Sequence, residues 1–165
     1  EAGLPFSFPG GPSFVFEAID SDLMAEAMAW AATAPTAGNE IFNITNGDVF
    51  AWSEVWPVIA AAVGMNVGPP QPMSLVEVMP KHAAEWAAIV RKYQLRAPED
   101  LHTFVGASFG LADFCFAYGV DHAPPPILVS TIKLRKAGFA GCIDTEDMLR
   151  KWFRRFQDLR LLPPR

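Results

Sequence analysis

The stretch that decides the fold is Asn39–Trp52, with the sequence NEIFNITNGDVFAW. Its first part, Glu40–Thr45, is rich in β-branched and aromatic residues, and this composition predicts a strand. Asn46-Gly47-Asp48 follows as a turn signal. From Trp52 the apolar residues recur at helical spacing to about Val63, and the next residue is a glycine. The stretch therefore indicates a strand, a turn and a helix in succession.

Outside this stretch the sequence favours helices separated by short extended pieces. Asp20-Ser21-Asp22 offers side-chain oxygens for a helix start. Asp144, with Asp147 three residues later, resembles a capping box for the last helix. The fold class predicted is α+β, helix-rich with a few short strands. Further helices are expected over 22–33, from Pro80, over 101–118 and over 130–137, and extended pieces over 6–8, 14–19 and 73–76.

The chain has 165 residues, of which 51% are hydrophobic and 19% charged. This length suits one sizeable core and is short for two independent domains. The low charged fraction and the mean hydropathy of +0.18 exclude a disordered protein.

Charge is unevenly distributed along the chain. Residues 1–80 contain no Lys or Arg, and all 13 basic residues follow in 81–165. A chain with a net charge of −5 and no base in its first half is a poor nucleic-acid binder. The bases near the C-terminus are interpreted as a solvated helix face: Arg150, Lys151, Arg154, Arg155 and Arg160.

The two cysteines, Cys115 and Cys142, form no CxxC pair, which argues against a disulfide scaffold or a cysteine-rich zinc site. A reducing cytoplasm is therefore the expected location. No uninterrupted apolar run is long enough to span a membrane. The chain begins with Glu1 and has no signal-type segment, so we expect a piece of a longer polypeptide or a processed mature chain.

Gly106–Gly110 (GASFG) matches the G-x-S-x-G nucleophile elbow of hydrolases. Asp113, Asp121 and His122 follow Ser108 closely and without intervening strands. A helix that packs through small residues is therefore the favoured interpretation, and a hydrolase is a weak alternative.

Other catalytic and cofactor motifs are missing from the sequence. His82, His102 and His122 lack the spacing of a metal site, and neither tyrosine has a lysine four residues later. No G-x-G-x-x-G or Walker sequence is present. Residues 101–118 nevertheless hold four phenylalanines and few charges, a composition that can line an apolar ligand cavity or form a lid.

The order of segments resembles the C-terminal part of an extended short-chain dehydrogenase/reductase of the NAD-dependent epimerase/dehydratase superfamily. It is most similar to the progesterone 5-beta-reductase/iridoid synthase-like group. The resemblance spans nearly the whole chain, and FNxTNGDVFxW is its most specific element. The residues that carry it are Phe8-Pro9-Gly10, Asp20–Glu26, Trp30–Ala32, Asn39–Trp52, Ser130–Lys136, Gly138–Gly141 and Asp144-Thr145.

The resemblance implies that residues 1–165 form a single substrate-binding domain, the C-terminal portion of an NAD(P)-binding Rossmann-type protein. In the family, a Rossmann domain that this chain lacks holds NADP or NAD and supplies a catalytic tyrosine and lysine. We therefore expect no catalytic, cofactor-binding or metal-binding residue here, and an isolated chain that is inactive and binds no cofactor. The implied reaction is NADPH-dependent reduction of an enone, with hydride delivered to the β-carbon.

The family's pocket-covering helix corresponds to about 103–118, although its tryptophans are replaced here by Ala107, Ser108 and neighbours. The predicted substrate-binding residues are Phe104, Ser108, Phe109 and Phe114. The predicted substrate is a small apolar carbonyl or enone compound. In the family the strand equivalent to 41–45 joins the sheet of the nucleotide-binding domain, so the isolated chain could hide this edge by self-association.

Two other interpretations stay open. The chain could be part of a sugar-nucleotide epimerase or dehydratase. From a different functional class, it could be a non-catalytic module that binds a small molecule or another protein.

Overall fold

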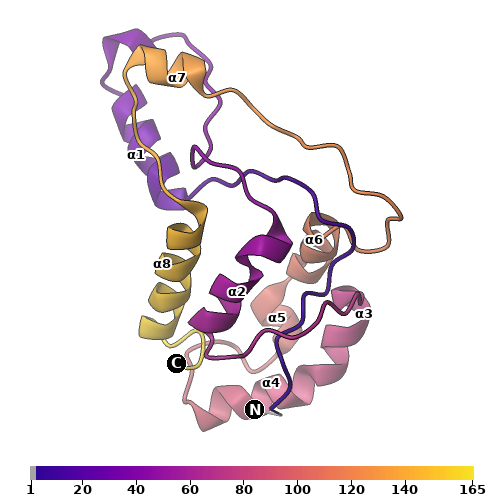
Figure 1. The fold of residues 1–165 in the computed structure, drawn as a ribbon. Coiled ribbons are helices and arrows are strands. Elements are labelled where there is room, and N and C mark those ends of the chain that lie inside the picture. The colour runs from indigo at the N-terminus through magenta and orange to yellow at the C-terminus, as the bar shows by residue number, and fades with distance from the viewer. Residues whose placement is uncertain (1–2) are drawn as a thin grey trace.

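Helices provide nearly all the regular structure of residues 3–165, the part of the chain that the computed structural model describes (Figure 1). The helix-rich character expected from the sequence is confirmed. The elements in chain order are α1 (Ser21–Ala31), η1 (Pro35–Ala37), α2 (Trp52–Ala62), α3 (Leu75–Val78), η2 (Met79–His82), α4 (Ala83–Lys92), α5 (Leu101–Val105), α6 (Ser108–Cys115), α7 (Ile132–Ala137) and α8 (Thr145–Asp158), with η marking 3-10 helices.

The expected strands over 14–19 and 40–45 do not form ladders. Between described residues, strand pairing is limited to two isolated bridges, a parallel one from Phe6 to Val67 and an antiparallel one from Phe16 to Phe50. Residues 41–45 are extended but lie beside no strand, and none of their backbone N–H groups is bonded within 3–165. A strand needs a neighbouring strand to complete its backbone hydrogen bonds, so a composition rich in β-branched and aromatic residues does not by itself produce a strand.

The single helix expected over 101–118 is also wrong. Gly106 adopts φ 55° and ψ −126°, a conformation that ends α5 and redirects the chain into α6. The expected extended piece over 73–76 gives way to α3 after Ser74, whose Oγ accepts from the Glu77 backbone N–H over 3.2 Å. Ser74 and Glu77 have the S-x-x-E spacing of a capping box, a signal present in the sequence.

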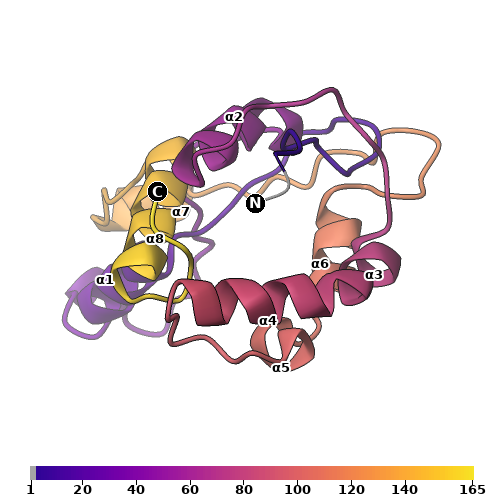
Figure 2. The ribbon, with the colours of Figure 1, turned by 90° about the horizontal axis from the view of Figure 1, so that it is seen from below.

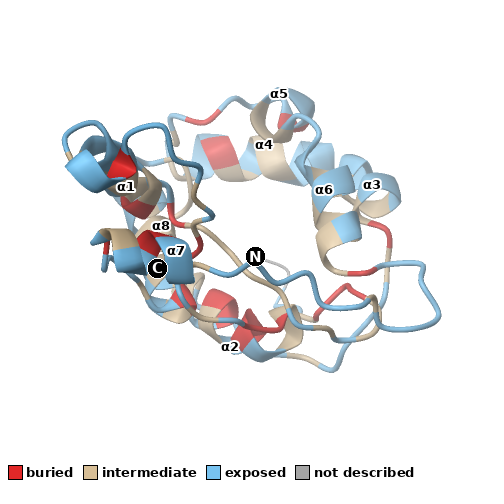
Figure 3. Cartoon of the chain, turned by 90° about the horizontal axis from the view of Figure 1, so that it is seen from above, coloured by how far each residue is buried: buried red, intermediate tan, exposed pale blue. Residues whose placement is uncertain are grey.

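The helices form two groups, one of α1, α2, α7 and α8 and the other of α3, α4, α5 and α6. Viewed from below, α4 and α5 lie opposite α2, with α1, α7 and α8 at one end and α3 and α6 at the other (Figure 2). Buried residues are present in α1, α2 and α4, whereas α3 and α6 contain none (Figure 3). The two clusters of buried apolar side chains in residues 3–165 lie around α1, α2, α7 and α8, where Trp56 and Ile59 of α2 form one and Leu23 of α1 with Leu134 of α7 the other.

Phe116, just after α6, joins the two groups through aromatic contacts. Its ring centroid lies 5.1 Å from that of Trp52, and 5.6 Å from those of Phe8 and Trp56. Its carbonyl accepts a hydrogen bond from the Gly11 backbone N–H over 2.9 Å. Edge-to-face and tilted ring pairs of this kind add stability beyond simple burial, so Phe116 is the main aromatic link between the groups.

A buried hydrogen-bond network ties the 46–48 turn to α8. Asn46 is fully buried, and its side-chain amide donates to Thr145 Oγ1 over 3.1 Å. Thr145 donates its hydroxyl to Asp48 Oδ1 over 2.7 Å and its backbone N–H to Asp48 Oδ2 over 3.0 Å. The start of α8 is therefore fixed to the turn as well as to its own cap, Asp144, which accepts from the N–H groups of Glu146 and Asp147.

The same network reaches α1 through Asp20, which is 1% exposed. Asn46 Oδ1 accepts from the Asp20 backbone N–H over 2.6 Å. The Asp20 carboxylate caps α1, accepts from Trp152 Nε1 over 2.8 Å, and pairs with Lys151 over 2.7 Å. Burial acts to raise the pKa of Asp20, but the hydrogen bonds from Lys151, Leu23 and Trp152 outweigh it and lower the pKa.

None of the helices in residues 3–165 combines the length and the apolar character that crossing a bilayer requires.

Candidate substrate-covering site

The segment expected to cover a ligand is held in place by two aspartates. Asp100 caps α5 by accepting from the Thr103 backbone N–H over 2.6 Å. Asp113, in α6, accepts from Ser74 Oγ over 2.9 Å and from the Leu75 backbone N–H over 2.8 Å, so it binds the N-terminal end of α3. Both carboxylates therefore have structural partners, and α6 is anchored to α3.

A cavity of about 140 Å³ lies where η2 and α4 meet α5 and the start of α6. Most of its walls are apolar, and two polar residues, Asp100 and His102, contribute to them. Typical pockets for drug-sized ligands are about 300–1,000 Å³. This cavity can thus enclose only a small group or one part of a larger molecule. Its lining residues are Pro80, Ala83, Asp100, Leu101, His102, Val105, Gly106 and Phe109.

The four predicted substrate-binding residues do not converge on this cavity. Phe109 lines it. Phe104 instead stacks on Trp86 of α4, with ring centroids 4.7 Å apart and planes at 14°. Ser108, the first residue of α6, is exposed, and Phe114 is 75% exposed. The structure therefore brings Phe109 together with Pro80 of η2 and Ala83 of α4.

Trp86 is one residue that sequence reasoning missed at this site. Its ring packs on Phe104, and its Nε1 donates to the Pro98 carbonyl over 2.9 Å. The sequence predicts a helix from Pro80 that includes Trp86, but the pattern did not show that this helix would face 101–118. Trp86 therefore links α4 to α5, although it does not line the cavity.

The G-x-S-x-G sequence spans the junction of two helices and not that of a strand and a helix. Ser108 begins α6, and α5 ends immediately before Gly106. The strained elbow that activates a hydrolase serine follows a strand. The Asp113 carboxylate accepts a hydrogen bond from the Leu75 N–H at the N-terminal end of α3, and His122 is exposed in a loop. This geometry gives no support to the hydrolase alternative.

Other reactive side chains in the described residues do not assemble into a site. No three of the His, Cys, Asp and Glu side chains in 3–165 lie close enough together to hold a metal ion. His82 faces Glu85, with Nδ1 and Oε1 3.3 Å apart. Burial raises the pKa of the Cys115 thiol, which disfavours the reactive thiolate. The Thr103 N–H lowers the pKa of Asp100, so this carboxyl is ionised at neutral pH.

No family model matches the chain. Comparison with curated proteins does find relatives. Over 154 residues the chain is 35% identical to (S)-8-oxocitronellyl enol synthase of Antirrhinum majus, a match covering 90% of the chain and 37% of that protein. The protein of the same name from Catharanthus roseus is 31% identical over 151 residues, which is 89% of the chain and 37% of that protein.

A third relative is named as a steroid reductase and not as an enol synthase. The 3-oxo-Delta(4,5)-steroid 5-beta-reductase of Arabidopsis thaliana is 29% identical over 167 residues, covering 98% of the chain and 41% of that protein. The chain thus spans well under half the length of the curated relatives it matches. The resemblance inferred from the motifs is confirmed: the chain is a homologue of the progesterone 5-beta-reductase/iridoid synthase-like group.

Proposed function

We propose that this chain forms the substrate-covering part of an NAD(P)H-dependent oxidoreductase that reduces a small enone or carbonyl compound. Homology to proteins named enol synthase and 5-beta-reductase supports the reaction class. The observation that carries the assignment of the site is the apolar cavity beside Phe109. It lies in the segment that corresponds to the family's pocket-covering helix.

In this proposal the chain binds and shields the substrate but performs no proton transfer. The apolar walls contributed by Leu101, Val105 and Phe109 would pack on the hydrocarbon part of the enone and exclude water. Asp100 is ionised and holds the α5 cap, so it is unsuited to donate a proton. NADPH or NADH, held by a nucleotide-binding domain outside these residues, supplies the hydride when bound.

The size of the cavity favours a small ligand or a ligand only partly held by this chain. A space of about 140 Å³ covers one end of a substrate, and the remaining walls would come from the nucleotide-binding domain. A sugar nucleotide would need several polar partners, and the mostly apolar lining does not offer them. We also propose a cytoplasmic location, which suits the free cysteines Cys115 and Cys142.

The test uses the full polypeptide encoded with these residues. We expect NADPH to be consumed when a short aliphatic enone is added, with the saturated carbonyl compound as product. A coding sequence with a glycine-rich turn after a strand and a Tyr-x3-Lys pair upstream of Glu1 would support the proposal. A start codon directly before Glu1, or turnover of a sugar nucleotide without net NADPH loss, would overturn it.

A further inference from the structure

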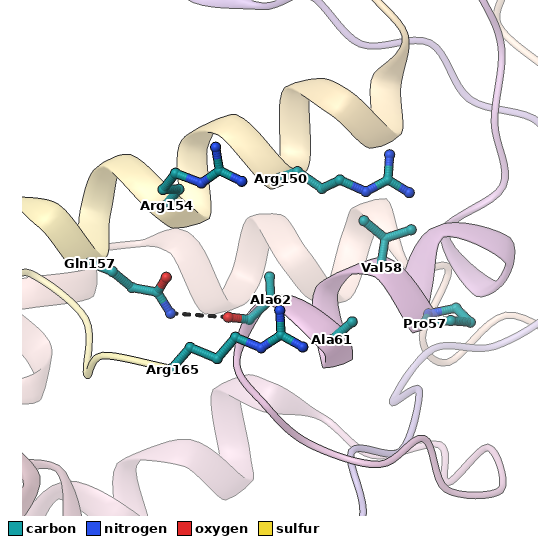
Figure 4. Close-up of a pocket in the computed structure, with 8 residues that line it drawn as sticks. All are labelled: Pro57, Val58, Ala61, Ala62, Arg150, Arg154, Gln157 and Arg165. Carbon is teal, nitrogen blue, oxygen red and sulfur yellow. Dashed lines mark hydrogen bonds between the residues drawn. The ribbon is translucent and has the colours of Figure 1, made fainter.

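A groove of about 410 Å³ separates the exposed side of α2 from α8, away from the cavity beside Phe109. Arg150 and Arg154 extend from successive turns of α8, and Arg165 reaches the same groove from the C-terminal tail (Figure 4). Three guanidinium groups therefore border one groove, and none of its eight lining residues is acidic.

Within the part of the chain that the structure describes, two of these arginines have no counter-ion. Arg150 pairs with Glu146 and Asp147 on its own helix, at 2.5 and 2.8 Å. Within residues 3–165, Arg154 and Arg165 make no ion pair and no side-chain hydrogen bond. A bound anion would satisfy the free guanidinium donors of Arg154 and Arg165.

The groove on the other flank of α8 is different. It shares Arg150 and Arg154 with the first groove and adds Lys151 and Arg155, but Asp147 and Asp158 are among its walls. Three of its four cations have acidic partners: Arg150 pairs with Glu146 and Asp147, Lys151 with Asp20 and Asp22, and Arg155 faces Asp22 at 3.5 Å. Within residues 3–165, the groove arginines without an acidic partner are Arg154, which lines both grooves, and Arg165, which lines only the groove on the α2 side. In a chain of net charge −5, such a cluster is a local exception that attracts anions.

The α2 side of the groove is apolar, with Pro57, Val58 and Ala61 facing the arginines. Gln157 donates its Nε2 to the Ala62 carbonyl over 3.0 Å and so links the end of α2 to α8. A ligand that fits both sides carries a doubly charged anionic group and a short apolar body. We propose that this groove binds a small phosphate monoester, with the phosphate on Arg154 and Arg165 and the apolar part on α2. This proposal goes beyond the reductase function and does not depend on it, because it uses different residues.

The test is a titration of the chain with phenyl phosphate, in which binding is measured by calorimetry and by the NMR shifts of the α2 and α8 amides. We expect saturable millimolar binding, tighter than for inorganic phosphate, that weakens as salt is raised. The double variant Arg154→Gln/Arg165→Gln should bind at least about tenfold more weakly, since it loses both free guanidinium groups. Arg91→Gln is the matched control, because Arg91 is a surface arginine already paired with Glu99 at 2.6 Å.

Arg154 and Arg165 are exposed, so the double variant should keep the circular dichroism spectrum and unfolding midpoint of the parent chain. Equal affinity in the double variant and in Arg91→Gln would overturn the site. Benzoate binding as tightly as phenyl phosphate would overturn the assignment of a doubly charged ligand. The absence of saturable binding would overturn the proposal as a whole, and none of these outcomes bears on NADPH-dependent enone reduction.

Discussion

The side-chain amide of Asn46 donates to Thr145 Oγ1 over 3.1 Å, although the two residues are 99 positions apart in the sequence. Both residues are almost completely buried. Asp20, a third buried member of the network, donates its backbone N–H to Asn46 Oδ1. Three of the motifs that carry the family resemblance thus meet at one buried polar network, so their sequence pattern reflects folding and not catalysis.

Asn46→Ala should lower the free energy of unfolding by about 3 kcal/mol, because it leaves buried partners at Asp20 and Thr145 without hydrogen bonds. The matched control is Asn43→Ala in the same motif. Asn43 is exposed and makes only a 3.4 Å contact with the Ser130 carbonyl, so its loss should cost about 0.5 kcal/mol or less. Urea denaturation of both variants measures the difference, and equal destabilisation would contradict the structural role of the network.

Phe116→Ala should destabilise the chain by about 3 kcal/mol, because it removes the ring that contacts Phe8, Trp52 and Trp56 between the two helix groups. Phe114→Ala, two residues away, should change stability by about 0.5 kcal/mol or less because Phe114 is 75% exposed. Thermal unfolding followed by circular dichroism compares the two. If Phe114→Ala proved the more damaging change, the proposed link between the groups would be wrong.

The lowered pKa of Asp20 predicts a loss of stability in acid. A carboxyl whose folded pKa lies below its unfolded value of about 3.9 stabilises the fold above that pH, and the contribution disappears as the pH falls through the folded pKa. Asp20→Asn should therefore lower stability at neutral pH and flatten its decline below about pH 4. Asp121→Asn, at an exposed loop position, is the control. An acid profile altered equally by both substitutions would refute the assignment to Asp20.

The isolated chain should not bind NADPH with micromolar affinity. It contains no G-x-G-x-x-G turn, and residues 1–80 offer no Lys or Arg to a pyrophosphate. Any contact of the cofactor's phosphates with the groove between α2 and α8 should be millimolar and should vanish in Arg154→Gln/Arg165→Gln. Micromolar binding, detected by nicotinamide fluorescence, would contradict the proposed division of labour between this chain and a separate nucleotide-binding domain.

Much of the fold follows from local signals in the sequence. Asp20 and Asp144 cap α1 and α8 as their positions predict, and the apolar stripe of α2 packs into the core through Val55 and Ile59. Residues 41–45 show the limit of such signals. Their composition suits a strand, but a strand depends on a partner that no local pattern specifies.

The candidate site was less predictable, since it depends on contacts between segments. The aromatic content of 101–118 indicated a cavity-lining segment, and Phe109 does line one. The sequence could not show that Gly106 divides the segment, that Phe104 would stack on Trp86, or that Phe114 would remain exposed. The break depends on the backbone conformation of Gly106, and the stacking of Phe104 depends on packing against α4; apolar periodicity specifies neither.

The most direct test of the central proposal is the effect of Phe109→Ala on kcat/KM for enone reduction by the full polypeptide with NADPH. We expect a loss of about tenfold or more, carried mainly by a higher KM, because an apolar wall of the substrate cavity is removed. Leu111→Ala, at a residue that is 63% exposed in α6, should leave kcat/KM within about twofold of the parent value. Equal values for Phe109→Ala, Leu111→Ala and the parent enzyme would contradict a substrate-covering role for this segment.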